Sequence, residues 1–275
     1  MTAVPLYHVD AFSNGPFTGN PAAVCLLQEA APAPWMQHVA AEMNLSETAF
    51  VVAGDGALSL RWFTPALEVP LCGHATLATA HALWESGWVP DDANIRFDTR
   101  SGVLTAARAG EAIELDFPAI PTDAATNAVD DVITALGATP IDVRSTPYRD
   151  LDDVDLLLVF EDATTVRSLT PRLDLLAAST RAGVIVTARG DDPSYDFVSR
   201  YFAPFAGIDE DPVTGSAHCV LAPYWAAQLG RERMTGYQAS ARGGKVGVAM
   251  HGDRVTLSGH ATTIAVGEMR VLPGG

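Results

Sequence analysis

The segments Arg61-Trp-Phe-Thr-Pro65 and Glu68-Val-Pro-Leu-Cys-Gly-His-Ala75 have a second copy further along the chain, in Arg200-Tyr-Phe-Ala-Pro204 and Glu210-Asp-Pro-Val-Thr-Gly-Ser-Ala217. Both copies read Arg-aromatic-Phe-x-Pro, a loop, and Glu-x-Pro-x-x-Gly-x-Ala, and a mostly apolar segment follows each. The loop of the second copy is three residues longer. The pattern predicts a duplicated unit, in which the residues that differ between the copies are the first candidates for chemistry.

The length and composition of the chain suit two halves of similar size. The 275 residues are 48% hydrophobic, which is enough for a core in each half. We predict a first half over residues 1–117 and a second half over 129–275, with its last strand able to pair with the first half. The segment 118–128 between them contains prolines and small polar residues that are typical of a linker.

The charge of the chain argues against several classes of partner. A formal net charge of −16 and a pI of about 4.6 disfavour nucleic acid and anionic membranes, since both attract basic surfaces. We therefore expect a small-molecule partner. A cytoplasmic location is also expected, because the sequence contains neither a signal-peptide pattern nor a long apolar run. Three widely spaced cysteines do not predict a disulfide framework.

The sequence offers little support for a cofactor or a metal ion. Lys245 is the only lysine, so any Schiff base with pyridoxal phosphate would have to use it. The Gly-Gly-Lys of 243–245 is followed by valine and lacks the P-loop ending, and no Gly-x-Gly-x-x-Gly follows a strand. No Cys/His cluster has the spacing of a zinc site. We expect a reaction without a cofactor and no metal site.

Hydrophobic periodicity predicts the same order of elements in both halves. In the first half, helices over 33–43 and 75–84 lie among strands near 4–12, 20–27, 48–54, 58–64, 94–99, 102–108 and 111–117. In the second half, helices near 172–180 and 214–229 lie among strands near 141–148, 154–160, 182–188 and 197–204, with three or four strands at the end. The helix over 75–84 has almost no polar face, so we expect a sheet that rolls around it.

Each copy of the repeat places a glycine at the start of the apolar helix. Gly73-His74 and Gly215-Ser216 are therefore predicted at helix N-termini. Free backbone N–H groups and the positive end of the helix dipole make such a position suitable for an anion, and two of them facing across a cleft could hold one carboxylate. The alternative is that glycine and serine are simply good residues with which to start a helix.

The ionisable residues differ between the copies. The unlike pairs are Asp211 opposite Val69, His74 opposite Ser216, Cys72 opposite Thr214 and Glu47 opposite Arg181. A carboxylate that enters a buried strand is either paired or has a raised pKa, which suits a proton carrier. For each candidate a structural alternative stays open: Glu47 as a strand-end residue in water, His74 bonded to the backbone, and Asp211 as a turn residue.

The motifs resemble those of the PhzF family of phenazine-biosynthesis isomerases and their homologues. The matching segments are Val9-Asp-Ala-Phe-Ser-Asn-Gly-Pro-Phe-Thr-Gly-Asn-Pro-Ala-Ala-Val24, Leu45-Ser-Glu-Thr-Ala-Phe50, Glu68-Val-Pro-Leu-Cys-Gly-His-Ala-Thr-Leu-Ala78 and Asp209-Glu-Asp-Pro-Val-Thr-Gly-Ser-Ala-His-Cys219. They occur in the family's order and extend over most of the chain. They indicate the family much more specifically than the substrate.

The resemblance implies an α+β fold of the diaminopimelate-epimerase-like type. Two pseudo-symmetric halves, each a mixed sheet rolled around a central apolar helix, would hold the active site between them. It also implies a cofactor-independent isomerase that forms a homodimer. Glu47 would be the general acid/base, and His74 and Asp211 would assist the proton transfer. The substrate's carboxylate would bind at Gly73, Gly215 and Ser216.

Two other functions remain open at this stage. The related epimerases use two cysteine thiols, one on each side of the substrate. Here Cys72 is opposite Thr214 and Cys219 is opposite Leu77, so the repeat lacks a matched thiol pair. An amino-acid epimerase or racemase that uses these cysteines is the first alternative. A non-catalytic protein that binds a small ligand on the same scaffold is the second.

Overall fold

A computed structural model describes residues 3–54, 56–125, 129–146 and 155–273 of the chain. Two compact units are present, one of residues 1–117 and 257–275, the other of residues 118–256. Residues 126–128 of the expected linker and the end of the strand expected over 141–148 lie outside the described ranges. Within them, no helix is both long enough and apolar enough to cross a membrane.

The first unit contains the elements that the periodicity predicts, with small changes at their ends, and one short strand that it did not predict, β5. They are β1 (Val4–Ala11), β2 (Asn20–Leu27), α1 (Ala33–Met43), β3 (Glu47–Val52), β4 (Leu58–Phe63), β5 (Glu68–Val69), α2 (Gly73–Glu85), β6 (Ile95–Thr99), β7 (Gly102–Ala109), β8 (Ala112–Pro118) and β17 (Ala261–Met269). β2 is parallel to β3, and β4 is parallel to β6, whereas β3–β4, β6–β7 and β7–β8 are antiparallel. β17, the last strand of the chain, is antiparallel to β1.

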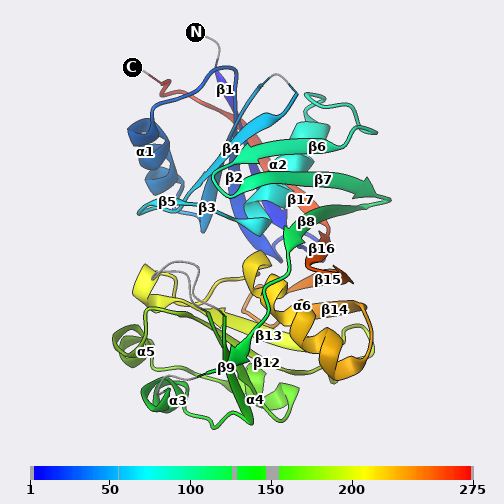
Figure 1. Ribbon diagram of the computed structural model, residues 1–275. Coiled ribbons are helices and arrows are strands. Elements are labelled where there is room, and N and C mark those ends of the chain that lie inside the picture. Colours follow the sequence, from blue (N-terminus) through cyan, green and yellow to red (C-terminus); the bar gives the residue numbers. More distant parts are fainter. Residues whose placement is uncertain (1–2, 55, 126–128, 147–154, 274–275) are drawn as a thin grey trace. The chain divides into compact units, whose positions relative to one another are not determined.

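The apolar helix α2 forms the centre of the first unit. All of its first eight residues are buried, and it packs against β1, β2, β3 and β17. Figure 1 shows α2 and α1 on opposite sides of the strands β2 and β3. On the α1 side, Phe50 and Phe63 pack edge to face in a cluster with Met36. The sheet therefore buries both of its faces, which explains why β2 and β3 are continuous apolar runs rather than alternating ones.

The second unit repeats this order around α6. Its elements are β9 (Asp123–Ala124), α3 (Asp130–Leu136), β10 (Asp142–Ser145), β11 (Asp155–Val159), α4 (Ala163–Ser168), α5 (Leu173–Ser179), β12 (Gly183–Arg189), β13 (Phe197–Phe202), the 3-10 helix η1 (Pro204–Ala206), α6 (Gly215–Leu229), β14 (Arg233–Gln238) and β15 (Gly244–His251). β16 (Arg254–Gly259) contains the boundary with the first unit. β11–β12 and β13–β14 are parallel, and β12–β13 and β14–β15 are antiparallel. These pairings match the first unit ladder by ladder.

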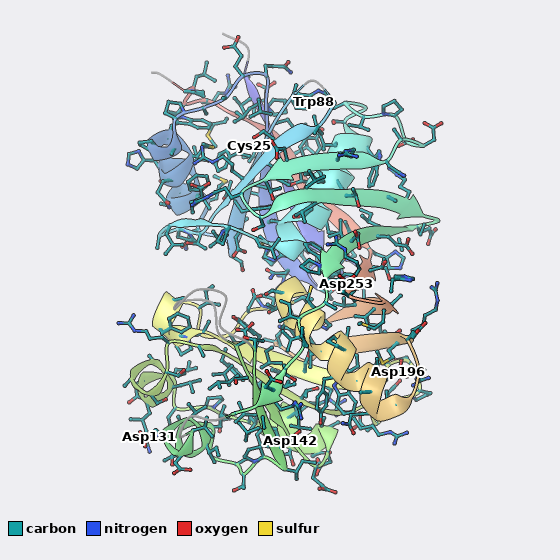
Figure 2. The ribbon with its side chains drawn as sticks, in the orientation of Figure 1. Cys25, Trp88, Asp131, Asp142, Asp196 and Asp253 are labelled. Carbon is teal, nitrogen blue, oxygen red and sulfur yellow. The ribbon has the colours of Figure 1, made fainter. Side chains whose placement is uncertain are left out.

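Three short helices pack on one side of the sheet of the second unit, and the sequence pattern predicted only one of them, α5, near 172–180. α3, α4 and α5 pack in one apolar cluster with β11 and β12. On the other side of the sheet, α6 packs against β14 and β15 (Figure 1). Among the acidic side chains of the second unit, Asp131 and Asp253 are exposed, and Asp142 and Asp196 are half-buried (Figure 2). Cys25, by contrast, is fully buried in β2 of the first unit.

The repeated motif is built as the same ion pair in both units. Arg61 donates to both carboxylate oxygens of Glu68, each at 2.8 Å, and Arg200 does the same to Glu210 at 2.7 and 3.0 Å. Each guanidinium also lies over a phenylalanine ring of its own strand. Such bidentate pairs fix geometry as well as energy. In each unit the arginine–glutamate ion pair therefore anchors the loop that leads into the central helix, although the loop of the second unit is three residues longer.

The strand ladders change one of the expected equivalences. Arg61 of the first motif lies opposite Phe50 in β3, and Arg200 of the second motif lies opposite Val186 in β12. Three residues before these positions are Glu47 and Gly183, so the structural equivalent of the glutamate is a glycine.

The expected pairing of Glu47 with Arg181 is therefore wrong, because the alignment of the two strands was displaced by two residues. At Gly183 a Cβ atom would lie 2.1 Å from the Tyr201 hydroxyl and 2.2 Å from Asp155 Oδ1, which are themselves 3.2 Å apart. The tyrosine and aspartate fill the space that a side chain would need. The second unit thus has no side chain at the position of Glu47.

Candidate functional site

Glu47 is the first residue of β3 and is only 8% exposed. The chain reaches this position from α1, whose last turn ends at Asn44 in the left-handed conformation with φ of 51°. Asparagine tolerates this conformation better than most residues do. The tight turn that follows carries the chain directly into β3, parallel to β2. The glutamate is therefore a buried residue of the strand, and not a strand-end residue in water.

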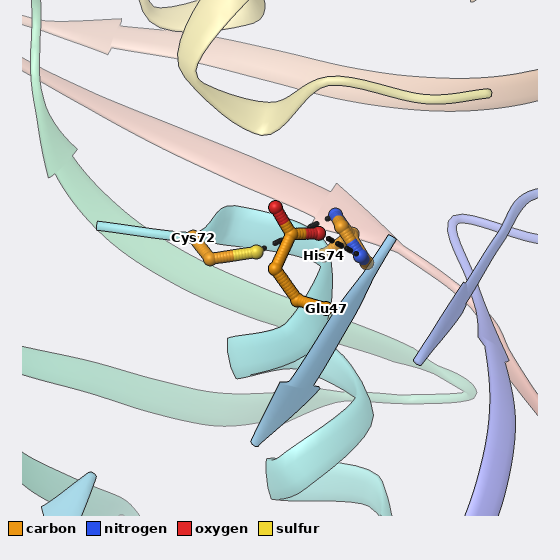
Figure 3. A group of neighbouring side chains, drawn as sticks. All are labelled: Glu47, Cys72 and His74. Carbon is orange, nitrogen blue, oxygen red and sulfur yellow. Dashed lines mark hydrogen bonds and ion pairs between the residues drawn. The ribbon is translucent and has the colours of Figure 1, made fainter. Parts of the chain in front are cut away.

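His74 and Cys72 meet Glu47 at the N-terminus of α2. His74 Nε2 lies 3.1 Å from Glu47 Oε2, and His74 Nδ1 lies 3.5 Å from Cys72 Sγ. Figure 3 shows the carboxylate and the sulfur on one side of the imidazole, with dashed lines for these contacts. Thr76 holds the start of the helix, because its hydroxyl donates to the Cys72 carbonyl at 2.5 Å. The helix start therefore brings a thiol and an imidazole to the proposed proton carrier.

Asn20 is a further contact of His74 that sequence reasoning missed. Its amide Nδ2 lies 3.1 Å from His74 Nδ1, and the residue is fully buried at the start of β2. Gly19 makes this approach possible, since a Cβ atom there would lie 2.3 Å from the Ala11 carbonyl oxygen, at a φ of 75°. The Gly-Asn pair of the opening motif was the available signal. Asn20 therefore contacts the imidazole nitrogen Nδ1, whereas Glu47 contacts the other ring nitrogen, Nε2.

The electrostatics of this group favour a charged imidazole and a neutral thiol. Burial raises the pKa of Cys72 to about 11, and the nearby Glu47 carboxylate acts in the same direction. Burial disfavours the imidazolium of His74, but Cys72 and Glu47 outweigh burial and hold its pKa well above the usual value. Because the thiol stays protonated near neutral pH, the carboxylate is the charge that stabilises the imidazolium.

In the second unit the predicted residues gather at the N-terminus of α6. Asp211 is 7% exposed, and its Oδ2 accepts a hydrogen bond of 2.5 Å from the Thr214 hydroxyl. Gly215 is the first residue of the helix and is buried, and Ser216 beside it is half-buried. The arrangement corresponds to that of the first unit, with threonine in the place of Cys72 and serine in the place of His74.

Gln238 is the second residue that sequence reasoning missed, and it supports this helix start. It is fully buried at the end of β14. Its Oε1 accepts from the Thr214 backbone N–H at 2.8 Å, and its Nε2 donates to the Asp211 carbonyl at 2.7 Å and to Thr214 Oγ1 at 3.1 Å. His218 adds a contact of 2.8 Å from its Nδ1 to the Thr214 carbonyl. No sequence motif marked Gln238, because the contact links positions far apart in the chain.

The comparisons with known proteins bear on the family. The profile of the family described as phenazine biosynthesis-like protein, PhzC-PhzF, matches residues 9–267. The chain belongs to this family. It is 46% identical to an uncharacterized isomerase of Halalkalibacterium halodurans over 269 residues, which cover 98% of this chain and 99% of that protein. The predicted family is therefore confirmed.

Solved structures confirm the α+β, diaminopimelate-epimerase-like fold. A PhzF-family phenazine biosynthesis protein of Enterococcus faecalis superposes with a TM-score of 0.89 at 42% identity, covering 98% of this chain and all of that chain. A protein named as a probable proline racemase, from Agrobacterium radiobacter, superposes with a TM-score of 0.61 at 13% identity, covering 98% and 94% of the two chains. The second likeness concerns the fold alone.

Proposed function

We propose that this protein is a cofactor-independent isomerase that moves a proton on a small carboxylate-bearing metabolite, with a cyclic amino acid as one candidate. The observation that carries the proposal is the buried Glu47 carboxylate, 3.1 Å from the His74 imidazole. A carboxylate that is shielded from water and lies beside an imidazole is suited to general acid/base catalysis. Membership of a family whose relatives are named isomerases supports the same reaction class.

In the proposed reaction Glu47 takes a proton from a carbon atom of the substrate. The electron pair left on that carbon spreads into an adjacent unsaturated system, and Glu47 returns the proton to a second carbon atom, so that no net oxidation or reduction occurs. His74, as an imidazolium, stabilises the Glu47 carboxylate before the transfer and any negative charge near it during the transfer. Neither step requires a redox cofactor.

Substrate binding is proposed for the two helix N-termini. The backbone N–H groups at Gly73 of α2 and at Gly215 and Ser216 of α6 are suited to a carboxylate, since each helix contributes the positive end of its dipole. Asp211, fixed by Thr214, would orient a polar group of the substrate by accepting a hydrogen bond from it. These roles agree with the family resemblance and remain part of the proposal.

Exchange of substrate hydrogen with solvent tests the proposed function. Candidate cyclic amino acids and other small carboxylates are incubated with the protein in D2O, and deuterium at carbon is followed by NMR and mass spectrometry. For a substrate that is turned over, Glu47→Gln should reduce the rate by about 10²–10⁴-fold, the usual contribution of general acid/base catalysis. The matched control is Glu42→Gln, which changes an exposed glutamate of α1. Full activity of Glu47→Gln would refute the proposal.

A thiol-based epimerase is the second candidate, because Cys72 lies 3.5 Å from His74. Its raised pKa counts against it, since the thiolate is the reactive form. Loss of activity on alkylation of Cys72, together with a harmless Glu47→Gln, would favour this candidate. Binding of a carboxylate without turnover, unchanged by Glu47→Gln, would instead favour a non-catalytic ligand-binding protein.

A further inference from the structure

Glu47, Cys72 and His74 present the three side-chain donors that zinc most often uses in proteins. Their ligand atoms, one from each residue, all lie within 4.8 Å of one another. Zinc sites with three protein ligands and one open position commonly combine imidazole with thiolate or carboxylate. Although the sequence spacing is not that of a zinc motif, the fold brings β3 and the start of α2 together, and with them the three donors (Figure 3).

The separation of two of these donors already suits one tetrahedral ion. A Zn–S bond of about 2.3 Å and a Zn–N bond of about 2.0 Å at the tetrahedral angle place sulfur and nitrogen about 3.5 Å apart. The separation of Cys72 Sγ and His74 Nδ1 is 3.5 Å. Coordination through His74 Nδ1 would require the Asn20 amide, whose Nδ2 lies 3.1 Å from this nitrogen, to move away from it. The Glu47 carboxylate needs only a side-chain adjustment to become the third ligand.

Buried polar atoms around this point are incompletely satisfied. Among the described residues, Glu47 Oε2 and His74 Nε2 are buried and make no hydrogen bond of good geometry, although they lie 3.1 Å apart. Such atoms are uncommon in folded proteins, and a bound ion is one way in which their bonding capacity becomes satisfied. With the ion bound at His74 Nδ1, Glu47 Oε2 would become a ligand and His74 Nε2 would carry the ring proton. The unsatisfied Glu47 oxygen is therefore the second observation, independent of the donor chemistry, that points to a cation here.

We infer that Glu47, Cys72 and His74 form a site for a soft divalent cation such as Zn²⁺, which blocks the proton carrier while it is bound. A thiolate and a carboxylate neutralise the two charges of the ion, with a neutral imidazole as third ligand. The thiol loses its proton to solvent on coordination, as metal-bound thiols do. The fourth position stays open to water.

The consequence for activity follows from the shared carboxylate. A Glu47 oxygen that is bound to a metal ion cannot take a proton from the substrate, so metal binding and isomerisation exclude one another. This inhibitory effect rests on the proposed function, whereas metal binding does not. The reaction itself needs no ion. The site would therefore make the enzyme sensitive to free zinc.

Cobalt binding tests the site directly, because Co²⁺ bound to a thiolate has a sulfur-to-metal charge-transfer absorption. The full-length protein, freed of any affinity tag and of metal, is titrated with Co²⁺ and then with Zn²⁺ as competitor. We expect one ion per chain, a charge-transfer band, and displacement of the cobalt by zinc. Cys72→Ala should abolish the band and weaken zinc binding at least about tenfold, the smallest loss typical even of an outer-shell change. Cys25→Ala should keep both.

The Cys25→Ala control removes a fully buried thiol of the same unit that lies in the α1-side cluster. Thermal unfolding in the absence of metal checks that each variant is folded, and Cys72→Ser replaces Cys72→Ala if the latter is not. Absence of a charge-transfer band in the wild-type protein, or its persistence in Cys72→Ala, would overturn the inference. Failure of deuterium exchange in the metal-free protein would instead overturn the proposed function, so the two failures are distinguishable.

Discussion

Replacing Gln238 with methionine should loosen the start of α6. The wild-type side chain makes three hydrogen bonds, one from the Thr214 N–H and two from its own amide nitrogen to the Asp211 carbonyl and Thr214 Oγ1. Each such bond contributes a net stability of about 0.5–1.5 kcal/mol, and a buried N–H left without an acceptor costs about 1–3 kcal/mol. Methionine retains most of the volume, so little cavity cost is added. Three bonds at about 1 kcal/mol each give about 3 kcal/mol, and the unpaired Thr214 N–H adds to this, so the loss is at least about 3 kcal/mol.

Hydrogen exchange read by mass spectrometry measures this loss where it occurs. Because 1.4 kcal/mol is a factor of ten in an equilibrium constant, 3 kcal/mol corresponds to roughly hundredfold faster exchange of the amides between Thr214 and His218. The control is Gln228→Met, an exposed position of the same helix, which should change stability by less than about 0.5 kcal/mol. If Gln238→Met exchanged in this segment no faster than the control, the assignment of Gln238 as the support of the helix start would be refuted.

Three further predictions concern charges and thiols. The pKa of His74 is raised in the folded protein, so the stability that depends on its charge is complete below pH 6.5 and is lost as the pH rises through the higher, folded-state value. Glu47→Gln should lower the pKa of His74 in an NMR titration. An unchanged pKa would contradict the electrostatic account. Arg200→Met breaks a largely buried ion pair and should reduce the free energy of unfolding by about 3–5 kcal/mol. Arg61→Met removes a more exposed guanidinium and should reduce it by only about 1 kcal/mol. Urea denaturation measures both losses. Cys72 should react with iodoacetamide more slowly at pH 7 than a free thiol and faster as the pH approaches 11, and rapid labelling at pH 7 in a mass-spectrometric assay would favour a thiol mechanism.

The order of the long elements could be predicted because each has an unmistakable hydrophobic pattern. The helix expected over 33–43 is observed over Ala33–Met43, and the strand expected over 20–27 is observed over Asn20–Leu27. α3 and α4 were missed because they have only seven and six residues, too few turns for a clear period. α2 begins two residues earlier than expected, since Gly73 and His74 are already helical.

The candidate site was predictable residue by residue but not as a set of contacts. The sequence motifs marked Glu47, His74 and Cys72, and the structure brings these three together. Asn20 and Gln238 were missed because their contacts depend on how β2 and β14 pack against helix starts far along the chain. The equivalence of Glu47 with Gly183 likewise depends on strand register, that is, on which residues of neighbouring strands lie opposite each other. A slip of one or two residues in a gapped sequence alignment assigns a different residue to each position.

The comparison of the two units also limits the kind of reaction that the proposed function can perform. The second unit has Gly183 at the place of Glu47 and Ser216 at the place of His74, so the carboxylate–imidazole pair has no equivalent among the described residues of the second unit. An enzyme that inverts a centre with two bases needs an acid/base group for each face of the substrate. A single carrier instead takes the proton and returns it from the same side. Under the proposed function, the substrate must therefore offer two carbon atoms on one face, both within reach of the Glu47 carboxylate, and the product is a positional isomer rather than a mirror image.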